Sequence, residues 1–161
     1  MLACDDTCLH DESACNDEQA YVIDFCRLQF PASYMGSVGE VLDVFGRVYI
    51  GGLTDQTQMN DTAANVAMQV GYGPDGGDPL DDASWTWFDA AQNAGYGPGS
   101  PSFEANNDEY GGPMILPAAG DYDFAVRFTG DGGSTYTLCD GGDAGSSNGY
   151  APADAGQLTT I

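Results

Sequence analysis

The chain has 161 residues, with 25 acidic side chains against three basic ones, and its formal net charge at pH 7 is −22. A charge of this sign repels phosphate backbones and anionic lipid headgroups, so it argues against nucleic-acid binding and against anionic membrane surfaces. Hydrophobic residues make up 42% of the sequence, too many for a disordered chain, and the length fits one domain. No stretch approaches the length of a transmembrane helix, so we expect no membrane insertion.

Residues 1–19 form an acidic segment without hydrophobic periodicity, and this segment contains Cys4, Cys8 and Cys15. We expect a cysteine-rich tail there and a β-sandwich domain over residues 20–161. His10, also in the tail, is the sole histidine, and no C-x-x-C pair occurs. A zinc site would therefore need an unusual ligand set.

The two remaining cysteines, Cys26 and Cys139, flank most of the chain. A disulfide between them would close a long loop and stabilise the fold by roughly 4–5 kcal/mol in the chain-entropy model. Such a bond implies an oxidising compartment, so we expect an extracellular or cell-surface protein. Three cysteines in the tail leave one over, either as a free thiol or as a bridge to another chain.

Eight short segments have the alternating apolar pattern of β-strands and are separated by Gly, Asp and Pro. In chain order they lie at 21–30, 40–50, 65–72, 84–90, 110–116, 121–129, 134–139 and 157–161. No stretch shows a helical apolar stripe of ten or more residues. The sequence therefore predicts an all-β, Ig-like antiparallel β-sandwich of about seven to eight strands with long Gly- and Asp-rich loops.

The alternation also predicts which side chains face the core. For three of the strands the expected core residues are Cys26, Leu28 and Phe30; Val41, Val44, Phe45, Val48 and Ile50; and Tyr122, Phe124, Val126 and Phe128. Gly46 within the second of these strands indicates a β-bulge.

Carboxylates and amides are concentrated in the long loops, where they could supply the oxygen ligands of calcium. The candidate ligands are Asp75, Asp78, Asp81, Asp82, Asn107, Asp108, Asp140 and Asp143. None of these groups has the spacing of an EF-hand. The alternative interpretation is that the loops are simply acidic and solvated.

Trp85 and Trp87 lie two residues apart on a predicted strand and therefore share one face. This face suits either stacking against a glycan or packing within the protein, and packing is the interpretation we favour. Acid–base catalysis could use a carboxylate pair such as Asp108 and Glu109, but adjacent acids are expected by chance in so acidic a chain. With the only histidine in the tail, we expect a non-enzymatic protein.

Seven short sequence motifs occur together, one after another, within about residues 24–145. They are Leu28–Pro31, Gly46–Tyr49, Val70–Pro74, Trp85–Trp87, Asn106–Tyr110, Gly120–Ala125 and Tyr136–Asp140. The set resembles a β-sandwich domain of secreted multidomain bacterial proteins, and it is loosely similar to starch-binding-type carbohydrate modules. The resemblance implies an Ig-like fold and an extracellular location.

The tail is followed by an extended segment with Tyr21, Ile23 and Phe25 at alternate positions. Such a segment could add a strand to the sheet edge of a neighbouring subunit and be locked there by a disulfide. We therefore expect a structural subunit of an extracellular assembly, such as a filament, with copies of itself as partners and calcium as a cofactor. The alternative function is a carbohydrate-binding module that uses the tryptophan face.

Overall fold

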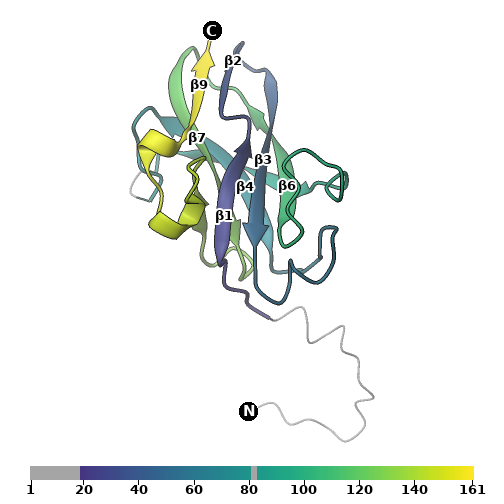
Figure 1. The fold of residues 1–161 in the computed structure, drawn as a ribbon. Coiled ribbons are helices and arrows are strands. Elements are labelled where there is room, and N and C mark those ends of the chain that lie inside the picture. The colour runs from purple at the N-terminus through teal and green to yellow at the C-terminus, as the bar shows by residue number, and fades with distance from the viewer. Residues whose placement is uncertain (1–18, 81–82) are drawn as a thin grey trace, which may run out of the picture.

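The computed structural model describes residues 19–80 and 83–161, and it confirms the all-β class. The strands are β1 (Phe25–Phe30), β2 (Ser33–Gly36), β3 (Val41–Tyr49), β4 (Ala67–Pro74), β5 (Thr86–Gln92), β6 (Asp108–Ile115), β7 (Gly120–Thr129), β8 (Thr137–Cys139) and β9 (Gly156–Thr160). Two short 3₁₀ helices, η1 (Gly145–Asn148) and η2 (Pro152–Asp154), lie between β8 and β9 (Figure 1).

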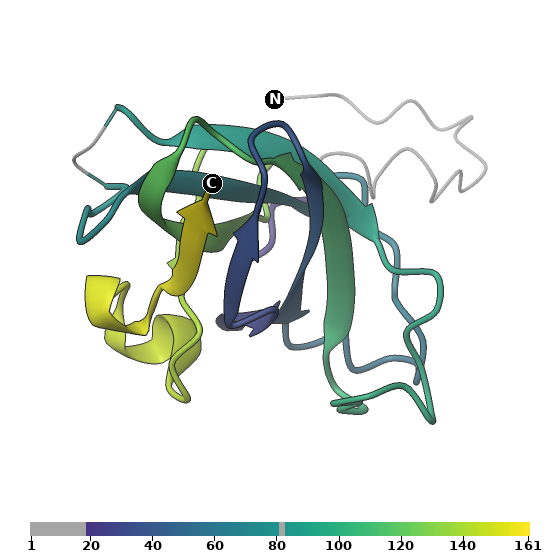
Figure 2. The ribbon, with the colours of Figure 1, turned by 90° about the horizontal axis from the view of Figure 1, so that it is seen from above.

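The strands form one continuous, curled sheet in the order β1-β3-β6-β5-β4-β7-β9-β2, with β8 paired to β7 (Figure 2). Strand β5 pairs with β4 along most of its length and with β6 at its end, which joins the two halves of the sheet. Neighbouring strands are antiparallel as predicted, except that β2 runs parallel to β9. The Ig-like arrangement within this class stays a prediction.

The curl brings β3 against β4 and β7, and the core lies between these halves. A Cβ atom on Gly46 of β3 would lie 2.8 Å from the Met68 sulfur on β4 and 2.8 Å from Val126 on β7. Gly46 therefore allows the two halves to approach closely, and this is its structural role. The register shift lies instead on β1, between Leu28 and Phe30.

The pattern predicted for residues 121–129 is confirmed: Phe124, Val126 and Phe128 of β7 are fully buried, and Tyr122 packs against the same core. The partners of these side chains come from both halves of the sheet. The fully or almost fully buried ones include Cys26, Leu28, Val44, Val48, Met68, Val70, Met114, Cys139 and Leu158.

Three of the predicted core residues lie outside the core. Phe30 is 63% exposed because the irregularity between Leu28 and Phe30 breaks the alternation that buries Cys26 and Leu28. Val41 and Phe45 occupy odd positions of β3, whereas the even positions from Leu42 to Val48 face inward. Phe30 and Phe45 are cross-strand partners, so both contribute to the outer face of the sheet.

The first described residues leave the body at the end opposite the C-terminus (Figure 1). The strand predicted from Tyr21 begins at Phe25, and β2 was not predicted because only four residues form it. Across residues 19–80 and 83–161, no helix has the length and hydropathy needed to cross a membrane.

Candidate functional site

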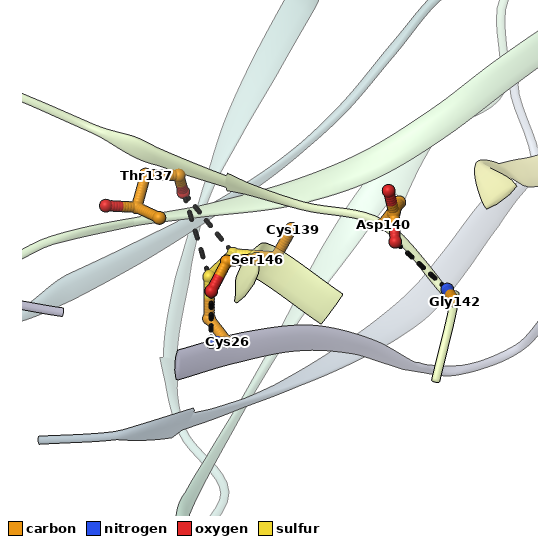
Figure 3. The surroundings of a disulfide bond; sticks show 6 residues. All are labelled: Cys26, Thr137, Cys139, Asp140, Gly142 and Ser146. Atoms are coloured by element: carbon orange, nitrogen blue, oxygen red, sulfur yellow. Dashed lines mark hydrogen bonds between the residues drawn. A yellow bond between two sulfur atoms is a disulfide. The ribbon is translucent and has the colours of Figure 1, made fainter. Parts of the chain in front are cut away.

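Cys26 of β1 and Cys139 of β8 form a disulfide, with their Cα atoms 5.5 Å apart and both residues fully buried (Figure 3). The predicted pairing is confirmed. It joins positions 113 residues apart in the sequence. Cys4, Cys8 and Cys15 lie outside the described residues.

The same region covers the outer edge of β1. The Cys26 amide donates to Ser146 Oγ at 2.9 Å, and the Leu28 amide donates to the Asp140 carbonyl at 2.8 Å (Figure 3 shows the former pair). The Arg27 guanidinium donates to the Gly141 carbonyl. Two backbone amides that β1 would otherwise present to another strand, those of Cys26 and Leu28, are therefore satisfied within the chain.

Asp140 and Asp143, predicted as calcium ligands, bind different partners. The buried Asp140 carboxylate accepts hydrogen bonds from the amides of Gly142 at 3.0 Å and Ala151 at 2.9 Å, which fixes the loop between them. Asp143 is fully exposed and lies 3.3 Å from Arg27 Nη2. Asp140 thus acts as a structural anchor in this loop.

The other predicted ligands are spread over two regions. Asp78 accepts a hydrogen bond from the Leu80 amide, and Asp75 lies in the turn after β4, while Asp81 and Asp82 fall outside the described residues. Asn107 donates to Glu104 at 2.8 Å, and Asp108 accepts from the Asp61 amide at 2.9 Å. In the part of the chain that the structure describes, no three His, Cys, Asp or Glu side chains are grouped in a way that could hold a metal ion. Calcium binding stays a prediction.

Asp108 and Glu109 are neighbours in sequence but lie on opposite faces of β6. Asp108 pairs with the inward-facing Val48, and Glu109 pairs with Arg47 on the outer face. The Asp108 carboxyl is 1% exposed, and its Oδ1 atom is buried without a hydrogen-bond partner. Burial raises the pKa of Asp108 to about 7, against a smaller opposing effect of the Asp61 amide. Because the two carboxyls are separated by the sheet, they do not form a catalytic pair.

The two tryptophans lie flat against glycines of β4. A Cβ atom on Gly71 would come within 2.5 Å of the Trp87 ring, and one on Gly73 would overlap the Trp85 ring. The two indoles stack with their centroids 5.5 Å apart, and Tyr150 contacts Trp85 edge-on. Trp85 is 7% exposed as a result.

Arg127 extends this aromatic stack along the outer face of β7. Its guanidinium lies 4.1 Å from the centroid of Trp87 and 4.0 Å from that of Tyr136, and it donates two hydrogen bonds to Gln69 Oε1. The predicted glycan face is therefore largely covered by the chain's own side chains. The two tryptophans pack against other side chains of the protein, which is the interpretation that we favour from the sequence. This packing lies on the outer face of the sheet and not in the core. Glycan binding there stays a prediction.

The predicted assembly strand contacts its own domain. The Tyr21 amide donates to the Gly130 carbonyl at 2.7 Å, and Tyr21 and Ile23 pack against the core. Phe25 is the first residue of β1 and pairs with Tyr49. These three residues are therefore part of the folded body.

A pocket of about 290 Å³, which the sequence analysis did not predict, lies on the outer face of β1, β3 and β6, and we call it the Phe45 pocket. Its lining comes from β1, β3, the β5–β6 loop and β6, and includes Gln29, Phe30, Phe45, Asn93, Pro101 and Glu109. These positions are far apart in sequence. Only the register shift in β1, which turns Phe30 outward, brings its two phenylalanines together.

The polar part of the Phe45 pocket is organised around Glu109, which is 6% exposed. Asn93 Nδ2 donates to Glu109 Oε1 at 2.6 Å, and Gln29 Nε2 donates to Oε2. Burial raises the pKa of Glu109, and these two hydrogen bonds and the charge of Arg47 oppose that rise. Gln29 Oε1 is buried without a hydrogen-bond partner.

The apolar walls of the Phe45 pocket are fixed by packing. The Phe45 ring lies against Gly111, where a Cβ atom would come within 2.6 Å of the ring. The loop that carries Pro101 is anchored by Tyr96, which is 1% exposed and whose hydroxyl bonds to the backbone of Glu104. The pocket is therefore formed by three strands and an anchored loop, and it combines aromatic walls with a few converging polar groups, as ligand sites do.

No model of a known protein family matches the chain, and no curated protein matches it significantly. The function must therefore be inferred from the chain's own residues and geometry.

Proposed function

We propose that the protein is a non-catalytic structural subunit of an extracellular or cell-surface assembly, linked through cysteines of residues 1–19. The observation that carries this proposal is the balance of cysteines. The Cys26–Cys139 bond uses two of the five, and Cys4, Cys8 and Cys15 remain. Three cysteines cannot all pair with one another, so one is left over, and we assign it to a bond with another chain rather than to a free thiol. A buried disulfide also fits an oxidising compartment.

An exposed apolar cluster at the C-terminal end supports the proposal. It consists of Met35, Val38, Val41, Ile115 and Ile161, each at least 51% exposed. Val41 pairs with Ile115 across β3 and β6, the Val38 amide donates to the Ile161 carbonyl at 3.1 Å, and Met35 pairs with Thr159 two residues before Ile161. The backbone pairings therefore bring these five residues to the same end of the body. Clustered exposed apolar side chains in a protein of charge −22 favour an interaction surface.

The cluster and the tail junction lie at opposite ends of the body (Figure 1). A contact between the tail end of one copy and the apolar end of the next would be heterologous. Heterologous contacts produce rings or open filaments. The high negative charge opposes such contacts, and calcium or another divalent cation would weaken that repulsion by screening.

Light scattering of the native secreted protein tests the proposal. We expect a species much heavier than the 16.8 kDa chain, which falls to that mass after mild reduction. A triple variant with Cys4, Cys8 and Cys15 replaced by serine should be monomeric without reductant, and it retains the Cys26–Cys139 bond. A native protein that is monomeric before and after reduction would rule out the proposed linkage.

A further inference from the structure

We propose that the Phe45 pocket binds a primary alkylammonium group, of the kind that a lysine side chain of another protein presents. This inference does not depend on the assembly proposal. The pocket lies on the outer face of β1, β3 and β6, and none of its lining residues belongs to the tail or to the exposed apolar cluster.

The polar atoms that lack a full set of partners in this pocket favour a hydrogen-bond donor as the ligand. Glu109 is a carboxylate with one hydrogen bond on each oxygen, so each oxygen can accept another. Gln29 Oε1, on the amide group that donates to this carboxylate, is a buried oxygen without a hydrogen-bond partner, so it adds negative potential beside Glu109 rather than a contact for the ligand. An ammonium group carries three donors and no acceptor, which matches these groups.

The aromatic walls favour a cation on an aliphatic stem. Phe30 is 63% exposed, and Phe45 is its cross-strand partner, so both rings border the pocket. Aromatic faces attract ammonium groups, most strongly where water is partly excluded. Pro101 on the opposing loop adds an apolar surface for methylene groups.

The balance of charge around the pocket also favours a cation. Arg47, the cross-strand neighbour of Glu109, is a positive charge that acts on Glu109, and its ion pair with Glu104 at 2.7 Å partly offsets that charge. The whole chain adds a net charge of −22, which steers cations toward the protein and repels anions.

The sequence restricts the source of the ammonium group. All three basic residues are arginines, Arg27, Arg47 and Arg127, and the chain contains no lysine. A lysine side chain in the pocket is therefore none of these 161 residues, and we assign it to another protein. A neutral sugar would also stack on phenylalanine rings, so sugar binding is an outcome that the experiment must separate from the proposal.

The test is a titration of the protein with each probe. Binding is measured by calorimetry and by the backbone amide NMR signals of the pocket residues. The probes are a peptide with one lysine, the same peptide with that lysine acetylated, n-butylamine and maltotriose. We expect the lysine peptide to bind with a Kd on the order of 1 mM or tighter, with shifts centred on Gly95, Ser102 and Glu109. The acetylated peptide should bind at least about tenfold more weakly, because it has lost the charge and two donors.

Two variants in the pocket and one control outside it locate the binding. Glu109→Gln should weaken binding of the lysine peptide at least about tenfold, whereas Asp121→Asn removes the same charge from an exposed position on β7 and should change it less than twofold. Phe45→Leu keeps an apolar side chain but removes the ring, and should weaken binding about threefold or more. Thermal melting of each variant shows whether the fold is retained.

Equal affinity for the two peptides, or binding of maltotriose in the absence of lysine binding, would overturn the proposal. If n-butylamine binds more tightly than the lysine peptide, the proposal that the ammonium group comes from a protein is wrong. Equal weakening by Glu109→Gln and Asp121→Asn would show that the overall charge, rather than the pocket, attracts the peptide.

Discussion

Replacing Asp108 with asparagine should stabilise the fold at pH 8 and change it little at pH 4. The carboxyl is almost completely buried, one of its oxygens has no partner, and its pKa is raised from 3.8 to about 7. The folded state therefore binds this proton more tightly than the unfolded state does. The contribution of protonated Asp108 to the free energy of unfolding is fully present below about pH 4 and is lost as the pH rises through 7.

The magnitude follows from the pKa change. At about 1.36 kcal/mol per pKa unit, the free energy of unfolding of the wild type should fall by up to roughly 4 kcal/mol between pH 4 and pH 8 because of Asp108 alone. Asparagine keeps an oxygen that can accept the Asp61 amide and has no charge to bury. The variant should therefore lose most of this pH dependence.

The assay is urea unfolding followed by tryptophan fluorescence at pH 4, 6 and 8. Burial also raises the pKa values of Glu109 and Asp123, so part of the decline with pH should remain in the variant. Asp43→Asn, which removes an exposed carboxylate from β3, serves as the charge-matched control. The reasoning is refuted if Asp108→Asn and wild type differ equally at pH 4 and pH 8, or if the variant is the less stable protein at pH 8.

Further predictions concern the disulfide, the outer aromatic stack and calcium. Replacing Cys26 and Cys139 with serine should lower the free energy of unfolding by about 2–5 kcal/mol, and an unchanged urea midpoint would contradict a stabilising role for the bond. Gly71→Ala should cost about 1–3 kcal/mol because its Cβ would meet the Trp87 ring, whereas Gly95→Ala, with nothing nearer than 3.4 Å, should be close to neutral in thermal melts. Arg127→Lys should cost about 1 kcal/mol and change the tryptophan emission, because lysine cannot stack between two rings while donating two hydrogen bonds to Gln69; unaltered emission would count against the stack. Millimolar calcium should raise the melting temperature, and a chelator should reverse the effect; identical melts in both would remove calcium from the proposal.

The parts of the fold predicted from the sequence are those set by local alternation. Strand β7 was predicted because its inward side chains follow a strict period of two, and the Cys26–Cys139 pair because the other cysteines are clustered before residue 19. The predicted inward position of Phe30 was wrong because a single irregularity in β1 reverses the facing of one side chain. Strand propensity does not show where such a shift occurs.

The Phe45 pocket could not be predicted because its lining comes from four separate segments. The outer position of the tryptophan stack depends on Gly71 and Gly73. These glycines contact Trp87 and Trp85 from the adjacent strand and are distant from them in sequence. The Asp140 carboxylate is satisfied by the nearby Gly142 amide and by the amide of Ala151, 11 residues later in the chain. In each case the decisive contact is long-range, and the local sequence does not contain it.

The covering of the β1 edge by residues 140–146 has a consequence for aggregation. The disulfide anchors the start of this segment, so reducing it would free the segment to separate from β1 and expose the strand's unpaired backbone groups. An uncovered strand edge is a template for cross-β stacking between molecules. While it is intact, the Cys26–Cys139 bond therefore protects the protein against fibrillar precipitation as well as stabilising the fold, and reducing conditions should remove both effects.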